Sequence, residues 1–175
     1  GEDTEGIKAT LPEIDIRLTY RDGAQRVLLN GEDVSEAIRT PEISYYASKV
    51  SAVPEVRQFL LETQRNMAKN GNILMDGRDI GTVILPDAPV KIFLTASAQS
   101  RAERRCKELI EKGQQVTMEG ILRDINERDR QDMTRAVAPL KQADDAVLLD
   151  TSELTLEESI EAVLHIIREK TEEKA

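Results

Sequence analysis

Glycines and opposite charges come together in one short stretch, residues 76–82 (DGRDIGT). Gly77 and Gly81 have no Cβ, so the backbone at these positions can approach a ligand closely. Arg78 and Asp79 lie between them and carry adjacent opposite charges. Spacing alone leaves two interpretations open. One is a ligand-binding turn, in which arginine binds a phosphate or carboxylate. The other is a surface turn in which Arg78 and Asp79 pair with each other.

A second set of charges follows helical spacing. Ile121, Ile125, Arg128, Asp132 and Arg135 are three or four residues apart and therefore share one face of a helix. The face is apolar where it begins and charged where it ends, which favours a helix that leaves the core and enters a cleft. The alternative is an exposed i,i+4 ion pair between Arg128 and Asp132.

Arginine is concentrated in one part of the chain. Seven of the 15 arginines fall in residues 101–135, namely Arg101, Arg104, Arg105, Arg123, Arg128, Arg130 and Arg135. Arginine is favoured over lysine where a planar group must bind phosphate or carboxylate with two hydrogen bonds. The alternative is a set of exposed helix faces with weak i,i+4 ion pairs.

Composition excludes several other classes of protein. A single cysteine, Cys106, and a single histidine, His165, exclude an internal disulfide and a Cys/His zinc site. The net charge of −9 disfavours a nucleic-acid polymer as partner. No apolar run approaches the roughly 18 residues of a membrane span, and the acidic residues 1–5 do not resemble a signal peptide. We therefore expect a soluble protein of the reducing cytoplasm.

The elements before residue 70 are predicted to form a lobe made of a hairpin and helices. Residues 14–29 alternate apolar and polar side chains around turn residues 21–24, which predicts a β-hairpin. A second turn is expected at residues 30–34. Residues 41–69 are predicted to be helical, with Pro41 opening one helix and Pro54 another.

The remainder predicts an α/β domain with a parallel sheet. Three short apolar runs, residues 73–75, 90–94 and 146–150, are predicted buried strands, and helices are expected at 97–112 and 118–135. Parallel strands need such crossovers. A capping box at residues 155–158 begins a last helix, whose predicted core stripe is Ile160, Val163, Leu164 and Ile167. Ligands bind at the carboxyl ends of parallel strands, where residues 76–82 are expected to lie.

Several ordered blocks resemble bacterial cytidylate kinases. They are residues 31–39, 76–82, 86–94 and 127–140, and the resemblance covers nearly the whole chain from about residue 14. It implies the fold of P-loop nucleoside monophosphate kinases, with a parallel-sheet core, an inserted nucleotide-binding lobe and an arginine-rich lid. On this basis residues 1–69 are the CMP-binding insertion, and residues 70–175 are the α/β core with its lid at about 101–135.

The resemblance implies transfer of the ATP γ-phosphoryl group to CMP or dCMP with Mg²⁺. Arg57, Asp79 and Arg135 match the residues that read cytosine. Cytosine carries an N4 amino donor beside the N3 and O2 acceptors, so a carboxylate together with arginines is complementary to it.

The remaining implied roles concern the pentose and the phosphates. Ser48, Arg128 and Asp132 match the residues that hold the pentose, and Arg78 matches a ligand of the CMP phosphate. Positive charge on the lid near the transferring phosphoryl group would come from Arg101, Arg104 and Arg105.

The chain departs from the family at the phosphate-binding loop. Members begin with a strand and a Walker A loop, whereas neither GxxxxGK[ST] nor GxGxxG occurs in these 175 residues. We therefore expect this portion to be inactive and to fold poorly by itself, with the loop supplied by a longer product or a separate polypeptide. The alternative function is a non-catalytic nucleotide-binding or interaction module that keeps the CMP half-site.

Overall fold

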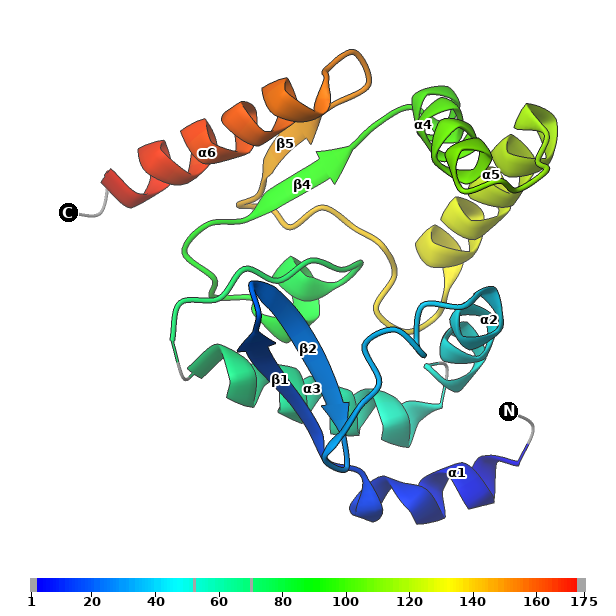
Figure 1. Cartoon of the computed structure of the whole chain (residues 1–175). Helices are drawn as coiled ribbons and strands as arrows, with labels where there is room; N and C mark the ends of the chain where they lie inside the picture. Colours follow the sequence, from blue (N-terminus) through cyan, green and yellow to red (C-terminus); the bar gives the residue numbers. More distant parts are fainter. Residues whose placement is uncertain (1–2, 52, 70, 173–175) are drawn as a thin grey trace. The chain divides into compact units, whose positions relative to one another are not determined.

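The computed structural model describes residues 3–51, 53–69 and 71–172 (Figure 1). The side chains at positions 41, 44, 45 and 48 also lie outside the described part. The chain divides into two compact units, Gly1–Ile73 and Leu74–Ala175.

A three-stranded antiparallel sheet forms the first part of the Gly1–Ile73 unit. Helix α1 (Thr4–Thr10) and the 3₁₀ turn η1 (Leu11–Glu13) precede strands β1 (Ile16–Arg21), β2 (Ala24–Leu29) and β3 (Glu32–Asp33), which pair in that order. Asp22 and Gly23 both have positive φ, 53° and 75°, as a two-residue hairpin turn requires. Asn30 and Gly31 repeat this at the second turn. The predicted hairpin and both turns are confirmed.

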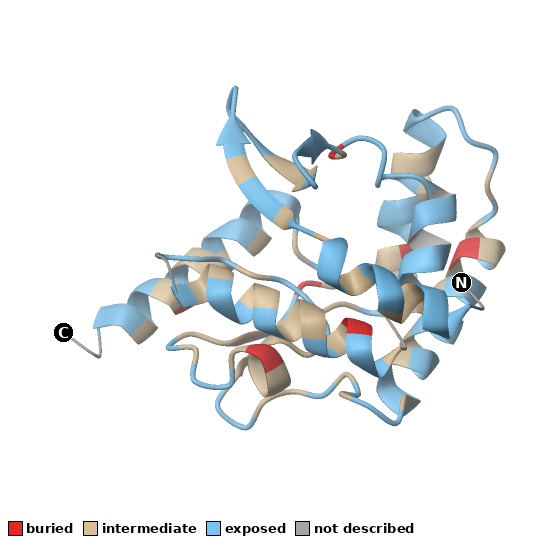
Figure 2. Cartoon of the chain, turned by 90° about the horizontal axis from the view of Figure 1, so that it is seen from below, coloured by how far each residue is buried: buried red, intermediate tan, exposed pale blue. Residues whose placement is uncertain are grey.

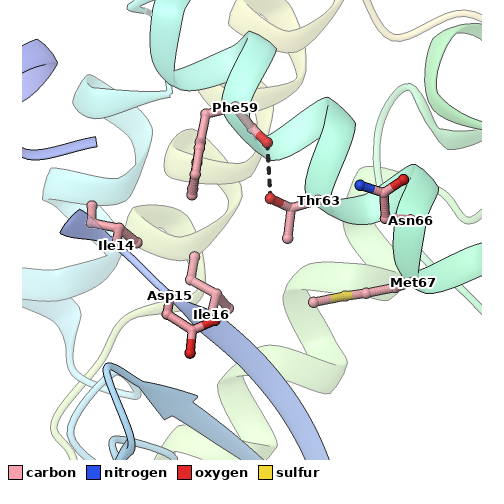
Figure 3. Close-up of a pocket in the computed structure, with 7 residues that line it drawn as sticks. All are labelled: Ile14, Asp15, Ile16, Phe59, Thr63, Asn66 and Met67. Atoms are coloured by element: carbon pink, nitrogen blue, oxygen red, sulfur yellow. Dashed lines mark hydrogen bonds between the residues drawn. The ribbon is translucent and has the colours of Figure 1, made fainter. Parts of the chain in front are cut away.

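Two helices complete this unit, and both begin at the predicted prolines. They are α2 (Pro41–Val50) and α3 (Pro54–Lys69). Proline suits the first helical turn because its missing N–H has no partner there in any case. Phe59 and Met67 of α3 line a shallow hollow of about 310 Å³ with Ile14 and Ile16, next to the start of β1 (Figure 3).

The Leu74–Ala175 unit contains a parallel sheet with helical crossovers. Strands β4 (Ile92–Thr95) and β5 (Val147–Asp150) pair from Ile92↔Val147 to Thr95↔Asp150. Helices α4 (Ala98–Glu111) and α5 (Met118–Thr134) pack on each other in the crossover, and α6 (Leu156–Glu172) lies along β5 (Figure 1). The predicted α/β class is confirmed, and Ser97 caps α4 as expected, with its Oγ accepting from Ser100 N.

A buried lysine fixes the start of this sheet. Lys91 directly precedes β4, and its side chain is mostly buried. Its Nζ donates to both carboxylate oxygens of Asp145, at 2.9 and 2.7 Å, and to the carbonyl of Pro86. Because a buried ammonium must be paired, this contact holds the loop before β5 against β4.

The strand predicted at residues 73–75 is wrong. No strand forms there among the described residues, and Leu74 is 89% exposed. An extended segment becomes a strand only when its N–H and C=O groups pair with a neighbour, which no described residue supplies to this segment. The other two predicted strands form but are less buried than expected. Leu94 and Leu148 point to opposite faces of the sheet, and both are exposed.

The core stripe predicted for α6 is partly wrong. The buried face is centred on Val163 and Ile166, and Ile160 is exposed. The helix is thus rotated by part of a turn from the predicted face, so that Ile160 lies at its edge. His165 is exposed and lies 3.2 Å from Glu169.

Few side chains are deeply buried in either unit (Figure 2). The buried apolar residues in the described part are Val56, Ile84, Ala102, Ile121 and Ile166. Helix caps and partly buried ion pairs therefore supplement the packing of half-buried apolar side chains.

The capping box of α6 gives a test of this contribution. Thr155 Oγ1 accepts from Glu158 N at 3.2 Å, and Glu158 Oε2 accepts from Thr155 N at 2.8 Å. Because Thr155→Val removes the accepting hydroxyl, we expect it to lower the free energy of unfolding by about 1 kcal/mol, measured by urea denaturation.

Thr171→Val near the other end of α6 is the matched control. Its hydroxyl donates only to helical carbonyls, those of Ile167 and Arg168. The control is expected to change the free energy of unfolding by less than about 0.5 kcal/mol. Equal losses for the two variants would contradict a capping role for Thr155.

Candidate functional site

Two ion pairs join the turn at residues 76–82 to the end of α5. Arg78 Nε donates to Asp132 Oδ2 at 2.7 Å, and Arg135 Nη2 lies 3.8 Å from Asp79 Oδ1. Each pair takes one residue from each segment, so the charges cross between segments more than 50 residues apart in the chain. This arrangement brings the two predicted charge clusters together in one place.

The turn itself is held by its own backbone. It continues into one turn of π-helix, η2 (Ile80–Ile84), where Val83 N and Ile84 N both donate to the carbonyl of Asp79, at 2.9 and 3.2 Å. A Cβ at Gly77 would lie 2.8 Å from Ile80 Cγ1. The close approach that requires glycine at position 77 is therefore made by the chain's own Ile80.

Burial differs sharply among the four charged groups. The Asp79 and Asp132 side chains are 12% and 18% exposed, whereas that of Arg78 is 44% exposed. Carboxylates buried to this degree need charged or hydrogen-bonded partners. The two aspartates thus hold the arginines, and Arg78 keeps part of its guanidinium open to solvent.

One nitrogen of the Arg135 guanidinium makes no hydrogen bond to the described residues. Its Nε donates to the carbonyl of Ala138 at 2.6 Å, while its Nη2 is buried and has no hydrogen-bond partner within the described residues. Buried donors are nearly always satisfied, because an unpaired one loses its hydration without compensation. Nη2 therefore keeps donor capacity that the described residues do not use.

The rotation of α5 is set by a bidentate ion pair to α4. Arg101 Nη1 and Nη2 donate to the two oxygens of Asp129, at 3.0 and 2.5 Å, and Arg101 Nε donates to the carbonyl of Ala96 at 3.0 Å. The Arg101 guanidinium holds the pKa of the Asp129 carboxyl below its usual value. The pair fixes the face of α5 that carries Asp132.

The other two predicted lid arginines have different surroundings. Arg104 donates to the carbonyls of Thr151 and Leu154 and, at 3.4 Å, to Thr151 Oγ1, so it joins α4 to the loop after β5. Arg105 pairs with Glu108 at 2.8 Å on the exposed surface of α4. The three arginines thus have three separate sets of partners.

Nearly the whole length of the chain resembles known proteins of one family. The family model described as cytidylate kinase matches residues 2–169. A protein named cytidylate kinase from Carboxydothermus hydrogenoformans is 50% identical over 171 residues, which are 98% of this chain and 77% of that protein. Those of Thermosipho melanesiensis and Klebsiella pneumoniae are 51% and 50% identical, over 97% and 96% of this chain and 76% and 75% of their own.

The chain belongs to the cytidylate kinase family. The resemblance seen in the sequence is confirmed, and with it the mixed α/β fold with a parallel sheet. The chain is a member of a nucleotide-binding kinase family. The roles of individual residues at the site stay predictions.

The remaining predicted site residues lie in less informative places. Arg128 is exposed on α5, one turn before Asp132. Arg57 is half-buried on α3 of the other unit. Ser48 belongs to α2, and its side chain lies outside the described residues. Their roles toward cytosine and pentose stay predictions.

Two residues of the site were missed by sequence reasoning. Asp129 lies 28 positions from Arg101, and nothing in the local pattern of α5 sets it apart from its neighbouring acids. Ala138 has φ of 49°, in the left-handed region where alanine is uncommon. Only the proline that follows it hinted at an irregular backbone.

In the described ranges, no three His, Cys, Asp or Glu side chains converge as metal ligands. No helix in the same ranges is long and apolar enough to cross a membrane.

The Arg101–Asp129 pair predicts a pH-dependent loss of stability. Because the folded state lowers the pKa of Asp129, the contribution is complete above the unfolded value of about 3.9 and is lost as pH falls through the folded value. We expect Asp129→Asn to lower the melting temperature by about 2–4 °C at pH 7. The difference in melting temperature between Asp129→Asn and the parent chain should disappear as the pH falls below about 4.

Asp124→Asn, the same change at an exposed position of α5, is the control for this melting series. It should shift the melting temperature little at any pH. An Asp129→Asn gap of equal size at pH 3 and pH 7 would show that the carboxylate charge is not what stabilises the contact.

Proposed function

We propose that this chain binds CMP or dCMP and takes part in transferring the γ-phosphoryl group of ATP to it, giving CDP or dCDP and ADP. The observation that carries the proposal is the ion pair between the mostly buried Asp79 carboxylate and the buried Nη2 of Arg135, which makes no hydrogen bond within the described residues. The names of the relatives, each a cytidylate kinase, support the same reaction.

This pair of groups matches one edge of cytosine. Asp79 offers an acceptor and Arg135 Nη2 a donor, 3.8 Å apart. Cytosine presents the N4 amino donor next to the N3 acceptor, so each base group meets a complementary one. Uracil has an acceptor at position 4, which the carboxylate would repel. Arg57 is the proposed third contact to cytosine.

The pentose and phosphate would be held beside the base. Asp132 and Arg128, one turn apart on α5, offer an acceptor and donors to pentose hydroxyls, and Ser48 is proposed to join them. Arg78 is the proposed ligand of the CMP phosphate, because part of its guanidinium remains exposed beyond its bond to Asp132.

Arg105 is the predicted lid arginine whose present partner a phosphate could replace most readily. Its partner Glu108 is exposed and is shared with Lys112, at 2.6 Å. Exposed ion pairs of this kind contribute little, so a phosphate can replace Glu108 readily. Arg101 and Arg104 would act mainly by holding α4 in position. Phosphoryl transfer depends on such positioning and charge neutralisation.

ATP and Mg²⁺ are the proposed co-reactants, with the ion carried by the ATP phosphates and water. Mg²⁺ is usually bound by one or two carboxylates, water and the substrate's phosphates rather than by a cage made of protein ligands alone. No step of the proposal uses a metal held by this chain.

The cradle for the β- and γ-phosphates would come from a segment with a Walker A loop, which these 175 residues do not contain. Such a segment would belong either to the same product or to a separate polypeptide. We propose that residues 1–175 alone bind CMP but do not catalyse phosphoryl transfer from ATP to CMP. The proposed location is the cytoplasm.

The second candidate function is a non-catalytic nucleotide-binding module. It is favoured by one observation, the lack of a Walker A sequence. The two candidate functions predict different results when a phosphate-binding loop is supplied. The kinase should then phosphorylate CMP, whereas the non-catalytic module should not.

Calorimetry and a coupled assay distinguish the two functions. Residues 1–175 should bind CMP more tightly than UMP in calorimetric titrations, and release no ADP with ATP, Mg²⁺ and CMP. Fusion to a segment carrying a Walker A loop should produce CMP-dependent ADP release. CMP binding without turnover in the fusion would favour the non-catalytic module. Equal binding of CMP and UMP would contradict the proposed substrate.

Base choice should depend on the charge of Asp79. A hydrogen bond to a buried charged group contributes about 1.5–3 kcal/mol, so Asp79→Asn should weaken CMP binding roughly 10- to 150-fold and narrow its advantage over UMP. The readout is the pair of dissociation constants for residues 1–175.

Asp76→Asn changes an exposed carboxylate in the same turn and is the matched control. The dissociation constants for CMP and UMP should both stay within about twofold of those of the parent chain, because solvent and salt screen an exposed charge. An unchanged CMP-to-UMP ratio in Asp79→Asn would remove Asp79 from the base site.

A further inference from the structure

The loop that follows α5 contains an unusual backbone conformation. In the described part of the chain, the non-glycine residues with positive φ are Asp22, Asn30 and Ala138. Asp and Asn tolerate the left-handed region because their short polar side chains bond locally, whereas alanine gains nothing there. Ala138 also precedes Pro139, which restricts its backbone further. Something other than local preference therefore holds Ala138 in this conformation.

The contacts of the loop show what this conformation achieves. The carbonyl oxygen of Ala138 accepts from Arg135 Nε at 2.6 Å. Two residues later, Leu140 N donates to the carbonyl of Asp132 at 2.8 Å. The loop thus folds back over the end of α5 and contacts both of the α5 residues that pair with the 76–82 turn.

The bond at Nε decides where the rest of the guanidinium points. A guanidinium is planar and its five N–H directions are fixed relative to one another. Once Nε is bound to Ala138, the direction of Nη2 is fixed as well. Nη2 then lies buried, without a hydrogen-bond partner in the described residues, 3.8 Å from Asp79 Oδ1.

We propose that Ala138 is a positioning residue for base selectivity: its left-handed backbone presents a carbonyl that holds Arg135 so that Nη2 stands beside the Asp79 carboxylate. The inference rests on the proposed function, in which Asp79 and Arg135 read the base. Ala138 acts through its backbone and does not touch the nucleotide.

A purely structural role for the loop makes different predictions. Arg135 N already closes α5 by donating to Gln131 O at 3.0 Å, and Leu140 N satisfies the carbonyl of Asp132. If capping α5 were the whole purpose of the loop, disturbing Ala138 would lower stability without changing the choice between CMP and UMP.

Three variants of residues 1–175 separate these roles. Ala138→Gly accepts a φ of 49° without strain and should preserve the site. Ala138→Val, with its β-branched side chain, disfavours the left-handed region and should withdraw the carbonyl from Arg135. Ala136→Val is the matched control, because it makes the same change at an exposed loop position that lacks positive φ.

Two readouts are needed. The first is hydrogen exchange of the Arg135 Nε–H, followed by nitrogen-15 NMR, which reports the bond to Ala138 without any nucleotide. The second is the ratio of the dissociation constants for CMP and UMP. Ala138→Val should speed the exchange of Nε–H, weaken CMP binding about 10-fold and narrow the CMP-to-UMP ratio by a similar factor. For Ala138→Gly and Ala136→Val, the exchange rate of Nε–H and both dissociation constants should stay within about twofold of the parent chain's values.

Several results would overturn the inference. One is an Ala138→Val chain in which exchange is fast but the CMP-to-UMP ratio is unchanged, since the bond would then have no role in selectivity. Another is slow exchange in Ala138→Val. A third is a loss of CMP affinity in Ala138→Gly that is as large as the loss in Ala138→Val. If Ala138→Val does not melt cooperatively, Ala138→Thr replaces it, because threonine is also β-branched and disfavours the left-handed region but is polar. Changes in the same direction are expected, and an unchanged CMP-to-UMP ratio again overturns the inference.

Failure of the proposed function gives a different pattern. A parent chain that binds CMP and UMP equally removes base reading, and the selectivity role of Ala138 falls with it. The exchange of Arg135 Nε–H would still show whether Ala138 holds the guanidinium.

Discussion

The crossed ion pairs between the 76–82 turn and the end of α5 are the constraint on which the rest of this site depends. The side chains of Asp79 and Asp132 are mostly buried, and each lies in an ion pair with an arginine of the other segment. Separating the segments would break both of these ion pairs. Because the pairs contain two negative and two positive charges, the segments meet without a net charge. The placement of the charged groups therefore follows from the requirement that buried charges be paired.

The remainder of the Leu74–Ala175 unit sets the frame for these pairs. Lys91 and Asp145 hold the loop before β5 to the start of β4, and the bidentate Arg101–Asp129 pair sets the rotation of α5 against α4. With so few deeply buried apolar side chains, charged contacts orient elements that packing alone would leave free to rotate. The same kind of interaction thus serves both the fold and the site.

The sequence predicted correctly those elements that depend on the backbone preferences of single residues. The hairpin turn at Asp22-Gly23 and the helix starts at Pro41 and Pro54 follow from backbone preferences of single residues, and all were predicted correctly. The strand at residues 73–75 was not, because strand formation depends on a partner that an apolar run does not reveal. The α6 stripe was misplaced at Ile160, since periodicity defines a face only to within part of a turn.

The site divides in the same way. Helical spacing brought out Asp132 and Arg135, and glycine spacing brought out Arg78 and Asp79, but their crossed pairing joins segments more than 50 residues apart and has no local signature. The left-handed Ala138 is likewise invisible in the sequence, because alanine, unlike glycine or asparagine, does not signal that conformation.

The contacts of Arg101 and Arg104 also determine how the α4–α5 hairpin can bend. Arg101 ties the first turn of α4 to Ala96 and to the second half of α5, and Arg104 ties the next turn to the loop after β5. Both attachments lie at the end of the hairpin nearest the sheet. The opposite end, the connection at residues 112–117 with Gly113 at its start, has neither. Because these two arginines hold the hairpin at the end nearest the sheet, we expect bending of the hairpin to displace residues 112–117 more than that end.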